Sequence, residues 1–463
     1  MNDSPLTRIA VIGSGPAGFY AAGHLLKEGA VDVDMLERLP TPWGLVRSGV
    51  APDHPKIKSV TRVYEKTAAH PRFRFFGNVN FGQHVSREDL LCHYDAIVYA
   101  TGSPVDRPLG IPGEDLPGSH AATEFVGWYN GHPDHTDLEV DLLSAERAVV
   151  VGNGNVALDV ARMLVLAPSE LAGTDTADHA LEVLAANNVN EVIVLGRRGP
   201  AQAAFTNPEL LELGELADAD VIVEGEELER ALAVHDETAE ADITCRRNVE
   251  ILRGYAERTP VGHSKRIVLR FLLSPTAFVA GSDGRLGAVQ LVRNELVAGD
   301  DGALRAHATD ETETISCELA FRAVGYRGLP LPAVAFDERA GVIPNDGGRV
   351  RDLESGEKQV GEYVVGWIKR GPSGVIGTNK KDAQETVDAI LADLGNGAAH
   401  SPRRPDPALV EKLLRERQPD LITYSGWEAI DRHERELGEA QGRPRVKLTR
   451  IEEMLQVASE ETP

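Results

Sequence analysis

Two copies of one strand, turn, helix and strand pattern constrain the fold of this 463-residue chain more than any other feature. In the first copy, an apolar run at 8–12 leads into the glycine-rich segment 13–18, a helical stretch and a second apolar run at 31–36. In the second copy, the run at 147–151 leads into the glycine-rich segment 152–157. Short, nearly all-apolar runs are typical of parallel strands buried on both faces. Each copy therefore predicts a βαβ unit with a right-handed crossover.

The distance between the copies predicts two nucleotide-binding domains, one inserted into the other. A buried strand ending in a tight turn is expected at 94–102, and 317–326 repeats this pattern, so we place the two crossovers there. Outer helices and loops are expected at 167–190 and 212–240. The predicted fold class is α/β with two Rossmann-like dinucleotide-binding domains in a glutathione reductase-like architecture. The expected divisions are 1–105, the inserted domain 106–325, and 326–463, which ends in a C-terminal helical tail.

The first glycine-rich segment has the spacing of a dinucleotide-binding turn. Gly13 permits the tight turn, Gly15 lets the backbone approach a pyrophosphate, and Gly18 allows the helix to pack closely on the strand. Glu37 follows the second strand about twenty residues further on, where a carboxylate accepts hydrogen bonds from an adenosine ribose. Strand, helix and acid together predict dinucleotide binding.

The second glycine-rich segment differs at the position that reads the ribose. Its second strand, expected at 191–195, is followed by Arg197 and Arg198 instead of an acid. Two guanidiniums suit the 2′-phosphate of NADP(H), which a carboxylate would repel. The alternative is an exposed basic loop. The first unit, with its acid, suits FAD, and the second suits NADP(H).

A third glycine-rich stretch, 366–377, precedes another helical pattern. Backbone N–H groups and a positive helix end suit the negative charge at the N1/C2=O edge of a reduced flavin. Trp367 in this stretch has an ordinary core position as its alternative, and the sequence alone does not separate the two.

Composition excludes several other classes of protein. The formal net charge of -24 disfavours nucleic acid or an anionic membrane as a general partner. No apolar run approaches the ~20 residues that span a bilayer. Cys92, Cys245 and Cys317 form no C-x-x-C pair, which argues against a disulfide framework, a zinc finger, a bound iron-sulfur cluster or a redox-active cysteine pair. No metal site is predicted, and the cytoplasm is the expected location because the first residues carry no targeting pattern.

These motifs together resemble the adrenodoxin reductase family of ferredoxin-NADP reductases, in its bacterial form. The resemblance runs through nearly the whole chain. It rests on GSGPAGFYAA at 13–22, PWGLVRSGVAPDHPKIK at 42–58, IPGEDLPGS at 111–119, GNGNVALDVAR at 152–162, GRRGP at 196–200 and GWIKRGPSGVIGTNK at 366–380. It implies an FAD domain made from both ends of the chain and an inserted NADPH domain. It also implies reversible transfer of electrons from NADPH through FAD, one at a time, to an iron-sulfur ferredoxin.

Motifs and resemblance together assign the candidate site residues. Contacts with FAD are implied for Gly13, Gly15, Pro16, Ala17, Gly18, Glu37, Leu45, Gly366, Trp367, Gly374, Val375 and Ile376. Contacts with NADP(H) are implied for Arg107, Gly152, Asn153, Gly154, Asn155, Val156, Arg197, Arg198 and Glu209. The resemblance adds His54, Asp159 and Glu212 as catalytic or tuning groups. Their alternatives are a helix cap for Asp53 or His54, a helix-dipole partner for Asp159, and a solvated acid for Glu212.

The partner implied by the resemblance is an acidic ferredoxin, and one segment offers it a basic surface. Residues 245–270 carry seven Lys and Arg against two Glu, a local net charge of +5. The candidate docking residues are Arg246, Arg247, Lys265 and Arg266. The alternative is a basic strand face that only offsets neighbouring acids. Two further functions use the same nucleotide motifs: an electron-input subunit such as the glutamate synthase small subunit, and a non-catalytic NADP(H)-sensing flavoprotein.

Overall fold

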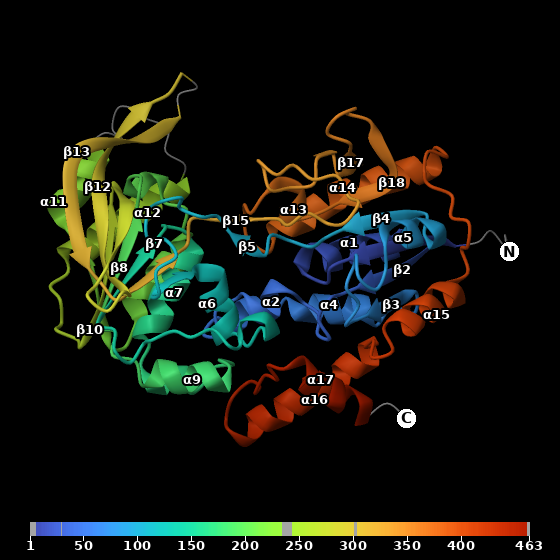
Figure 1. Ribbon diagram of the computed structural model, residues 1–463, viewed down its shortest axis with the longest axis horizontal. Helices are drawn as coiled ribbons and strands as arrows, with labels where there is room; N and C mark the ends of the chain where they lie inside the picture. The colour runs from blue at the N-terminus through green and yellow to red at the C-terminus, as the bar shows by residue number, and fades with distance from the viewer. Residues whose placement is uncertain (1–5, 29, 234–242, 301–302, 461–463) are drawn as a thin grey trace. The chain divides into compact units, whose positions relative to one another are not determined.

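The computed structural model describes residues 6–28, 30–233, 243–300 and 303–460 (Figure 1). The chain divides into two compact units. Unit 1 contains 1–105 and 326–463, and unit 2 contains 106–325. The chain passes between them at β5 (Val105–Asp106) and returns at β15 (Tyr326–Arg327).

Unit 1 is built on a seven-stranded sheet with the order β16-β17-β18-β4-β1-β2-β3. The five strands from β18 to β3 are parallel, and β17 and β16 are antiparallel additions. The bounds are β1 (Thr7–Ile12), β2 (Val31–Leu36), β3 (Phe73–Phe76), β4 (Ala96–Tyr99), β16 (Asn345–Asp346), β17 (Arg349–Arg351) and β18 (Lys358–Val364). Val11 lies in the core on one face of the sheet and its neighbour Ala10 in the core on the other. This two-sided burial explains the all-apolar run in the sequence.

Helices cover both faces of this sheet. One core packs β1 and β2 against α1, α4 and α14, and α1 and α14 lie side by side (Figure 1). The opposite core includes α5 and α15. The bounds are α1 (Pro16–Lys27), α2 (Leu45–Ser48), α3 (Pro55–Lys58), α4 (Thr61–Ala68), α5 (Arg87–His93), α13 (Trp367–Arg370), α14 (Thr378–Gly395), α15 (Pro407–Arg417), α16 (Tyr424–Ala440) and α17 (Ile451–Glu460).

The C-terminal helices are anchored on unit 1 by a buried ion pair and an aromatic contact. Trp427 of α16 packs edge-on against Trp43, with ring centroids 4.8 Å apart. Glu434 is completely buried, and its carboxylate accepts hydrogen bonds from Arg47 at 2.5 and 2.8 Å and from Arg445 at 3.1 Å. Loss of Arg47 or Arg445 would leave the buried Glu434 carboxylate without a full counter-charge, which is costly. The C-terminal helices are therefore firmly packed on unit 1.

Unit 2 contains a six-stranded parallel sheet with the order β6-β14-β7-β8-β10-β9. The antiparallel sheet β11-β12-β13 covers one face, where Val149 and Val151 meet Phe278 and Val289. Helices cover the other face. The strands are β6 (Ser119–Ala121), β7 (Arg147–Val151), β8 (Glu191–Gly196), β9 (Ala219–Val223), β10 (Lys265–Phe271), β11 (Leu273–Ala280), β12 (Leu286–Ala298), β13 (Leu304–Ser316) and β14 (Leu319–Arg322). The helices are α6 (Ala122–Tyr129), α7 (Asn155–Val165), α8 (Pro168–Leu171), α9 (Asp178–Ala185), α10 (Asn207–Glu212), α11 (Gly225–Ala233) and α12 (Ile243–Glu257).

The predicted α/β class with two Rossmann-like units is confirmed, but one element was assigned wrongly. The stretch 212–240 was expected to hold only outer helices and loops, yet β9 within it pairs with β10 as the edge strand of the main sheet. Only its two end residues are fully buried, so an edge position leaves a weaker apolar pattern than a central strand. Part of this stretch, 234–242, lies outside the described residues. Among the helices of the described residues, none is long and apolar enough to cross a membrane.

Candidate cofactor-binding sites

The first glycine-rich turn joins β1 to α1 and leaves an open helix end. Gly13 has a φ of 102°, and a Cβ on Gly18 would lie 2.2 Å from the Gly13 carbonyl oxygen. Side chains at these two positions would therefore break the turn. By contrast, a Cβ on Gly15 would meet no described atom within 4 Å, and Gly15 caps α1 without any side-chain hydrogen bond. The first N–H groups of α1 thus face free space suited to a pyrophosphate.

Glu37 lies directly beside this turn. Its Oε2 accepts hydrogen bonds from the Ser14 backbone N–H at 2.9 Å and the Ser14 hydroxyl at 2.6 Å, and its Oε1 accepts one from the Leu39 N–H at 3.1 Å. The carboxylate is therefore fixed in place, and its remaining lone pairs are available to a ribose hydroxyl. Its contact with a ribose stays a prediction.

Two other segments reach the same turn from distant parts of the sequence. The Trp43 backbone N–H donates to the Ser14 carbonyl at 3.1 Å, which places Leu45 at the start of α2 nearby. Gly366 has a φ of 78°, and a Cβ there would lie 2.5 Å from the Ala17 Cβ. The three predicted glycine-rich and loop segments of unit 1 therefore converge on one cradle.

Trp367 does not occupy an ordinary core position. It opens α13, stays partly exposed, and stacks on Tyr326 with ring centroids 5.6 Å apart. Its buried indole Nε1 finds no acceptor in the described part of the chain, and neither does that of Trp43. Beyond Trp367, Gly374 and Val375 are exposed and Ile376 is half-buried. Buried donors without acceptors are costly, so they indicate a ligand with acceptor atoms in this cradle.

His54 is 7% exposed and precedes α3, which begins with Pro55. It stands at the N-cap position, but its side chain makes no capping hydrogen bond. Its Nε2 lies 3.9 Å from Oδ1 of Asp53. The structure therefore does not support capping as the role of His54, and its catalytic or tuning role stays a prediction.

The second glycine-rich turn joins β7 to α7 in unit 2. A Cβ on Gly152 would lie 2.2 Å from the Ala323 carbonyl oxygen, whereas one on Gly154 would meet only a methyl group at 4.0 Å. Asn155 holds the turn because its Oδ1 accepts from the Thr206 N–H at 2.8 Å. The amide Nδ2 of Asn153 is buried without an acceptor among the described residues. This turn thus offers an open helix end and an unused donor, as the first one does.

For two other predicted nucleotide contacts in unit 2, the structure shows less evidence of a binding role. Val156, in the first turn of α7, is half-buried and packs against the unit 2 core. Arg107 is exposed, and its backbone N–H donates to the Gly325 carbonyl at 2.9 Å. Both therefore stay predictions.

Arg197 and Arg198 follow β8, at the position where the sequence predicts a contact with the adenosine ribose. Arg197 is exposed and Arg198 is half-buried, and neither forms an ion pair within the described ranges. Burial and the neighbouring charge of Arg197 lower the pKa of the Arg198 guanidinium. Two adjacent cations without a counter-charge favour a bound anion, which an ordinary basic loop would not require.

Three predicted acids lie on α7 and α10. Arg162 of α7 has its Nη1 2.8 Å from the Glu212 Oε2 and 4.0 Å from the Glu209 Oε2. Glu212 is therefore ion-paired, although its side chain remains 38% exposed, and its catalytic or tuning role stays a prediction. Asp159 is half-buried one turn before Arg162. The sequence analysis did not identify Arg162 as a site residue. Its position three residues after Asp159, on the same face of the predicted helix, could have indicated it.

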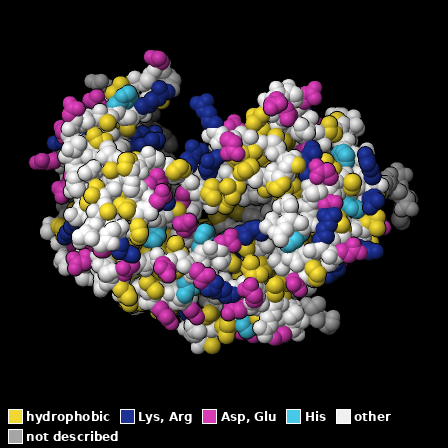
Figure 2. All heavy atoms as spheres, viewed as in Figure 1, with side chains coloured by type: hydrophobic (Ala, Val, Ile, Leu, Met, Phe, Trp, Pro, Cys, Tyr) yellow, Lys and Arg dark blue, Asp and Glu magenta, His cyan; other side chains and the backbone are white. Residues whose placement is uncertain are grey.

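The four predicted docking cations lie on two elements, and three of them already have partners within the described chain. Arg246 and Arg247 lie on α12, whereas Lys265 and Arg266 lie on β10. Arg247 pairs with Glu250 at 2.9 Å and Arg266 with Glu191 at 2.5 Å. The Lys265 Nζ donates to the Leu164 carbonyl and to Asn187 Oδ1, each at 3.2 Å, and burial lowers its pKa. On the face in Figure 2, basic side chains are interspersed with acidic ones.

The fold and its two open glycine turns define an oxidoreductase of the two-nucleotide class. Residues 7–194 match the family described as pyridine nucleotide-disulphide oxidoreductase. NADPH-ferredoxin reductase FprA of Mycobacterium tuberculosis is 52% identical over 97% of this chain and 98% of its own length. Mitochondrial NADPH:adrenodoxin oxidoreductase of Arabidopsis thaliana is 39% identical over 97% and 95%. The solved structure of M. tuberculosis FprA in complex with NADPH matches with a TM-score of 0.93 and 51% identity, over 98% and 100%.

The chain therefore belongs to the family of FprA and adrenodoxin-type ferredoxin reductases, as the sequence predicted.

Proposed function

We propose that this chain is a ferredoxin-NADP(+) reductase that passes electrons from NADPH through FAD, one at a time, to an iron-sulfur ferredoxin. The observation that carries the proposal is 52% identity over nearly the full length to an NADPH-ferredoxin reductase. Bound FAD supplies the exchange between two-electron hydride chemistry and single-electron release. The protein's task is to hold, orient and electrostatically tune the two nucleotides.

Unit 1 is the proposed FAD domain. The N–H groups at the start of α1 hold the pyrophosphate, and Glu37 accepts from the adenosine ribose. The Gly366–Ile376 segment lies against Ala17 of the same turn and presents the Trp367 Nε1, which has no acceptor among the described residues. These features fit a large anionic dinucleotide with many acceptor atoms.

Unit 2 is the proposed NADP(H) domain. Gly152 to Val156 bind the pyrophosphate. Arg197 and Arg198, two adjacent cations, bind the 2′-phosphate. Glu209 completes the proposed contacts. We assign Asp159 and Glu212 to positioning of the nicotinamide, with Arg162 fixing Glu212 by its ion pair.

Docking of ferredoxin is the least constrained part of the proposal. We assign it to the exposed face of α12. This face includes the exposed side chains of Arg246 and Arg247 and that of Ile243, which is 73% exposed. Lys265 and Arg266 contribute less, because internal hydrogen bonds and Glu191 already engage them. The cytoplasmic location also stays a prediction.

Two assays test the function and separate it from the alternatives. NADPH-dependent reduction of ferredoxin, followed through cytochrome c, should proceed and should depend on ferredoxin concentration. A flavoprotein that is bleached by NADPH but reduces no ferredoxin and no artificial acceptor would instead be an NADP(H) sensor. Activity only after adding a second subunit would favour the electron-input alternative.

A further inference from the structure

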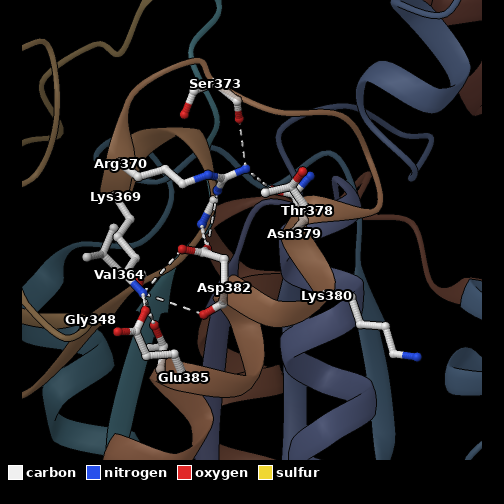
Figure 3. Close-up of polar contacts among 12 residues, drawn as sticks. Gly348, Val364, Lys369, Arg370, Ser373, Thr378, Asn379, Lys380, Asp382 and Glu385 are labelled. Carbon is white, nitrogen blue, oxygen red and sulfur yellow. Dashed lines mark hydrogen bonds and ion pairs between the residues drawn. The ribbon is translucent and has the colours of Figure 1, made fainter. Parts of the chain in front are cut away.

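Directly behind the proposed flavin segment of unit 1 lies a compact network of charged side chains (Figure 3). It joins Lys369 and Arg370, at the end of α13, to Asp382 and Glu385 on α14. Lys369 and Asp382 are each only 9% exposed. Charged groups are costly to bury at this depth unless each one is paired, so each of these side chains depends on the others.

Asp382 is the centre of the network. Its Oδ2 accepts the Gly366 backbone N–H at 2.6 Å and lies 3.4 Å from Arg370 Nη1. Its Oδ1 lies 3.2 Å from Lys369 Nζ. One carboxylate thus ties the first residue of the flavin segment to both cations that follow it.

The Lys369 ammonium group contacts three side chains of α14. Its Nζ also contacts Glu385 Oε2 at 2.7 Å and Thr386 Oγ1 at 3.1 Å. The Thr386 hydroxyl in turn donates to the Val364 carbonyl of β18 at 3.0 Å. The network therefore reaches from α14 to the end of the central sheet.

Arg370 extends the network across the loop that follows α13. Its Nη2 donates to the Ser373 carbonyl at 3.2 Å and to Asn379 Oδ1 at 3.1 Å. The guanidinium thereby joins the loop 371–377 to the first turn of α14. Gly374, Val375 and Ile376, the predicted flavin contacts, all lie in this loop.

We propose that Asp382 is a positioning residue for the flavin, which it serves by fixing the Gly366 backbone and by balancing the charges of Lys369 and Arg370. This inference rests on the proposed function, because it assumes that FAD occupies the cradle of unit 1. Two cations and two carboxylates leave the network close to neutral. Removing the Asp382 charge leaves it net positive, which favours the negatively charged reduced flavin and moves the flavin potential in the positive direction.

The test compares holoproteins carrying Asp382→Asn, Asp382→Ala and Glu385→Gln with the wild type. The measurements are the ratio of FAD to protein after gel filtration, the flavin midpoint potential and the thermal melt. Asp382→Ala removes acceptor and charge and should release FAD about tenfold faster, the effect of one hydrogen bond to a charged group. Asp382→Asn keeps an acceptor oxygen and should retain most FAD, yet still show the positive shift. Glu385→Gln, on a more exposed side chain, should shift the potential in the same direction but less.

Asp393→Asn is the matched control. Asp393 is also an ion-paired carboxylate of α14, bonded to Arg349 and Tyr363, but it lies eleven residues from Asp382, about 16 Å along the helix. It should change neither FAD retention nor potential.

The inference is overturned if all three network variants keep the wild-type potential and FAD ratio, or if Asp393→Asn changes both as much. If Asp382→Ala does not fold, Asp382→Asn and Glu385→Gln decide the question through the potential. A wild-type protein that holds no FAD would instead contradict the proposed function.

Discussion

The two glycine-rich turns share a backbone design but differ at the position where a contact with the adenosine ribose is predicted. In unit 1, Glu37 is already fixed by two hydrogen bonds from Ser14. In unit 2, Arg197 and Arg198 lack any ion pair among the described residues, and burial together with the charge of Arg197 lowers the pKa of the Arg198 guanidinium. We expect the turn to create the dinucleotide site and the residues after the second strand to select the nucleotide.

The turns also differ in how closely the helix approaches its strand. The third position is Gly18 in α1 and Ala157 in α7. A Cβ on Gly18 would collide with the Gly13 carbonyl, yet the methyl group of Ala157 is fully buried without such a clash. The FAD-type turn is therefore the tighter of the two, and it should be the less tolerant of substitution.

Exchange of these third-position residues should give the largest effects. Gly18→Ala forces the Cβ against backbone at 2.2 Å, so we expect a destabilisation of about 3 kcal/mol and purification without FAD. Ala157→Gly should cost only about 1 kcal/mol, as for glycine in a helix interior. Thermal melts and flavin absorbance of the two variants measure this difference. Equal losses in both would contradict the closer approach of α1 to its strand.

Removal of the two guanidiniums tests the selection of NADP(H). The double variant Arg197→Ala, Arg198→Ala loses the charge-assisted contacts to a 2′-phosphate, so its NADPH affinity should fall about 100-fold. NADH lacks that phosphate and should bind nearly as before. Anaerobic titration of the flavin absorbance with each nucleotide gives both affinities. Arg305→Ala, an arginine on the β13 strand of the same unit, is the control. Parallel losses for NADPH and NADH would rule out the phosphate role.

The sequence predicted these turns well because each is a local feature. A strand, its glycine turn and the next helix occupy one continuous segment, 7–27 in unit 1 and 147–165 in unit 2, and their pattern is set by those residues alone. The start and end of β2 and β7 follow directly from the limits of their apolar runs. The residues proposed to contact the ribose were also predictable from local sequence, since they directly follow the next strand.

Features formed by distant residues were not predictable in the same way. Glu212 meets Arg162 fifty positions away, and Gly366 donates to Asp382 from a different element. The basic segment 245–270 was interpreted as one surface because several acids that pair with its cations, such as Glu191 and Glu227, lie outside that segment. Hydrophobic periodicity within one segment does not predict such pairs, because they depend on how separate elements pack together.

A neutral substitution at Glu37 should produce a smaller change than the loss of Arg197 and Arg198. Glu37→Gln keeps an acceptor for Ser14 but loses its charge, so FAD should bind about tenfold more weakly. Fluorescence of released FAD on dilution measures this affinity. Asp32→Asn, on the same strand β2, is the matched control for a lost carboxylate. FAD binding that is unchanged in Glu37→Gln would mean that the carboxylate only stabilises the turn.

Charge reversal on α12 should give the smallest effect and distinguishes cations that bind nucleotide from cations that bind protein. Arg246 and Arg247 are exposed, and Arg247 already has Glu250 as a partner, so each contributes modestly in solvent. We expect Arg246→Glu with Arg247→Glu to raise the KM for ferredoxin about fivefold at low salt. NADPH oxidation by ferricyanide should not change, because ferricyanide does not need the docking surface. The difference from the wild type should shrink as salt screens the attraction. A rise in the KM for NADPH instead would mean that α12 and the Arg197–Arg198 pair serve the same ligand, and the division of cationic roles within unit 2 would fail.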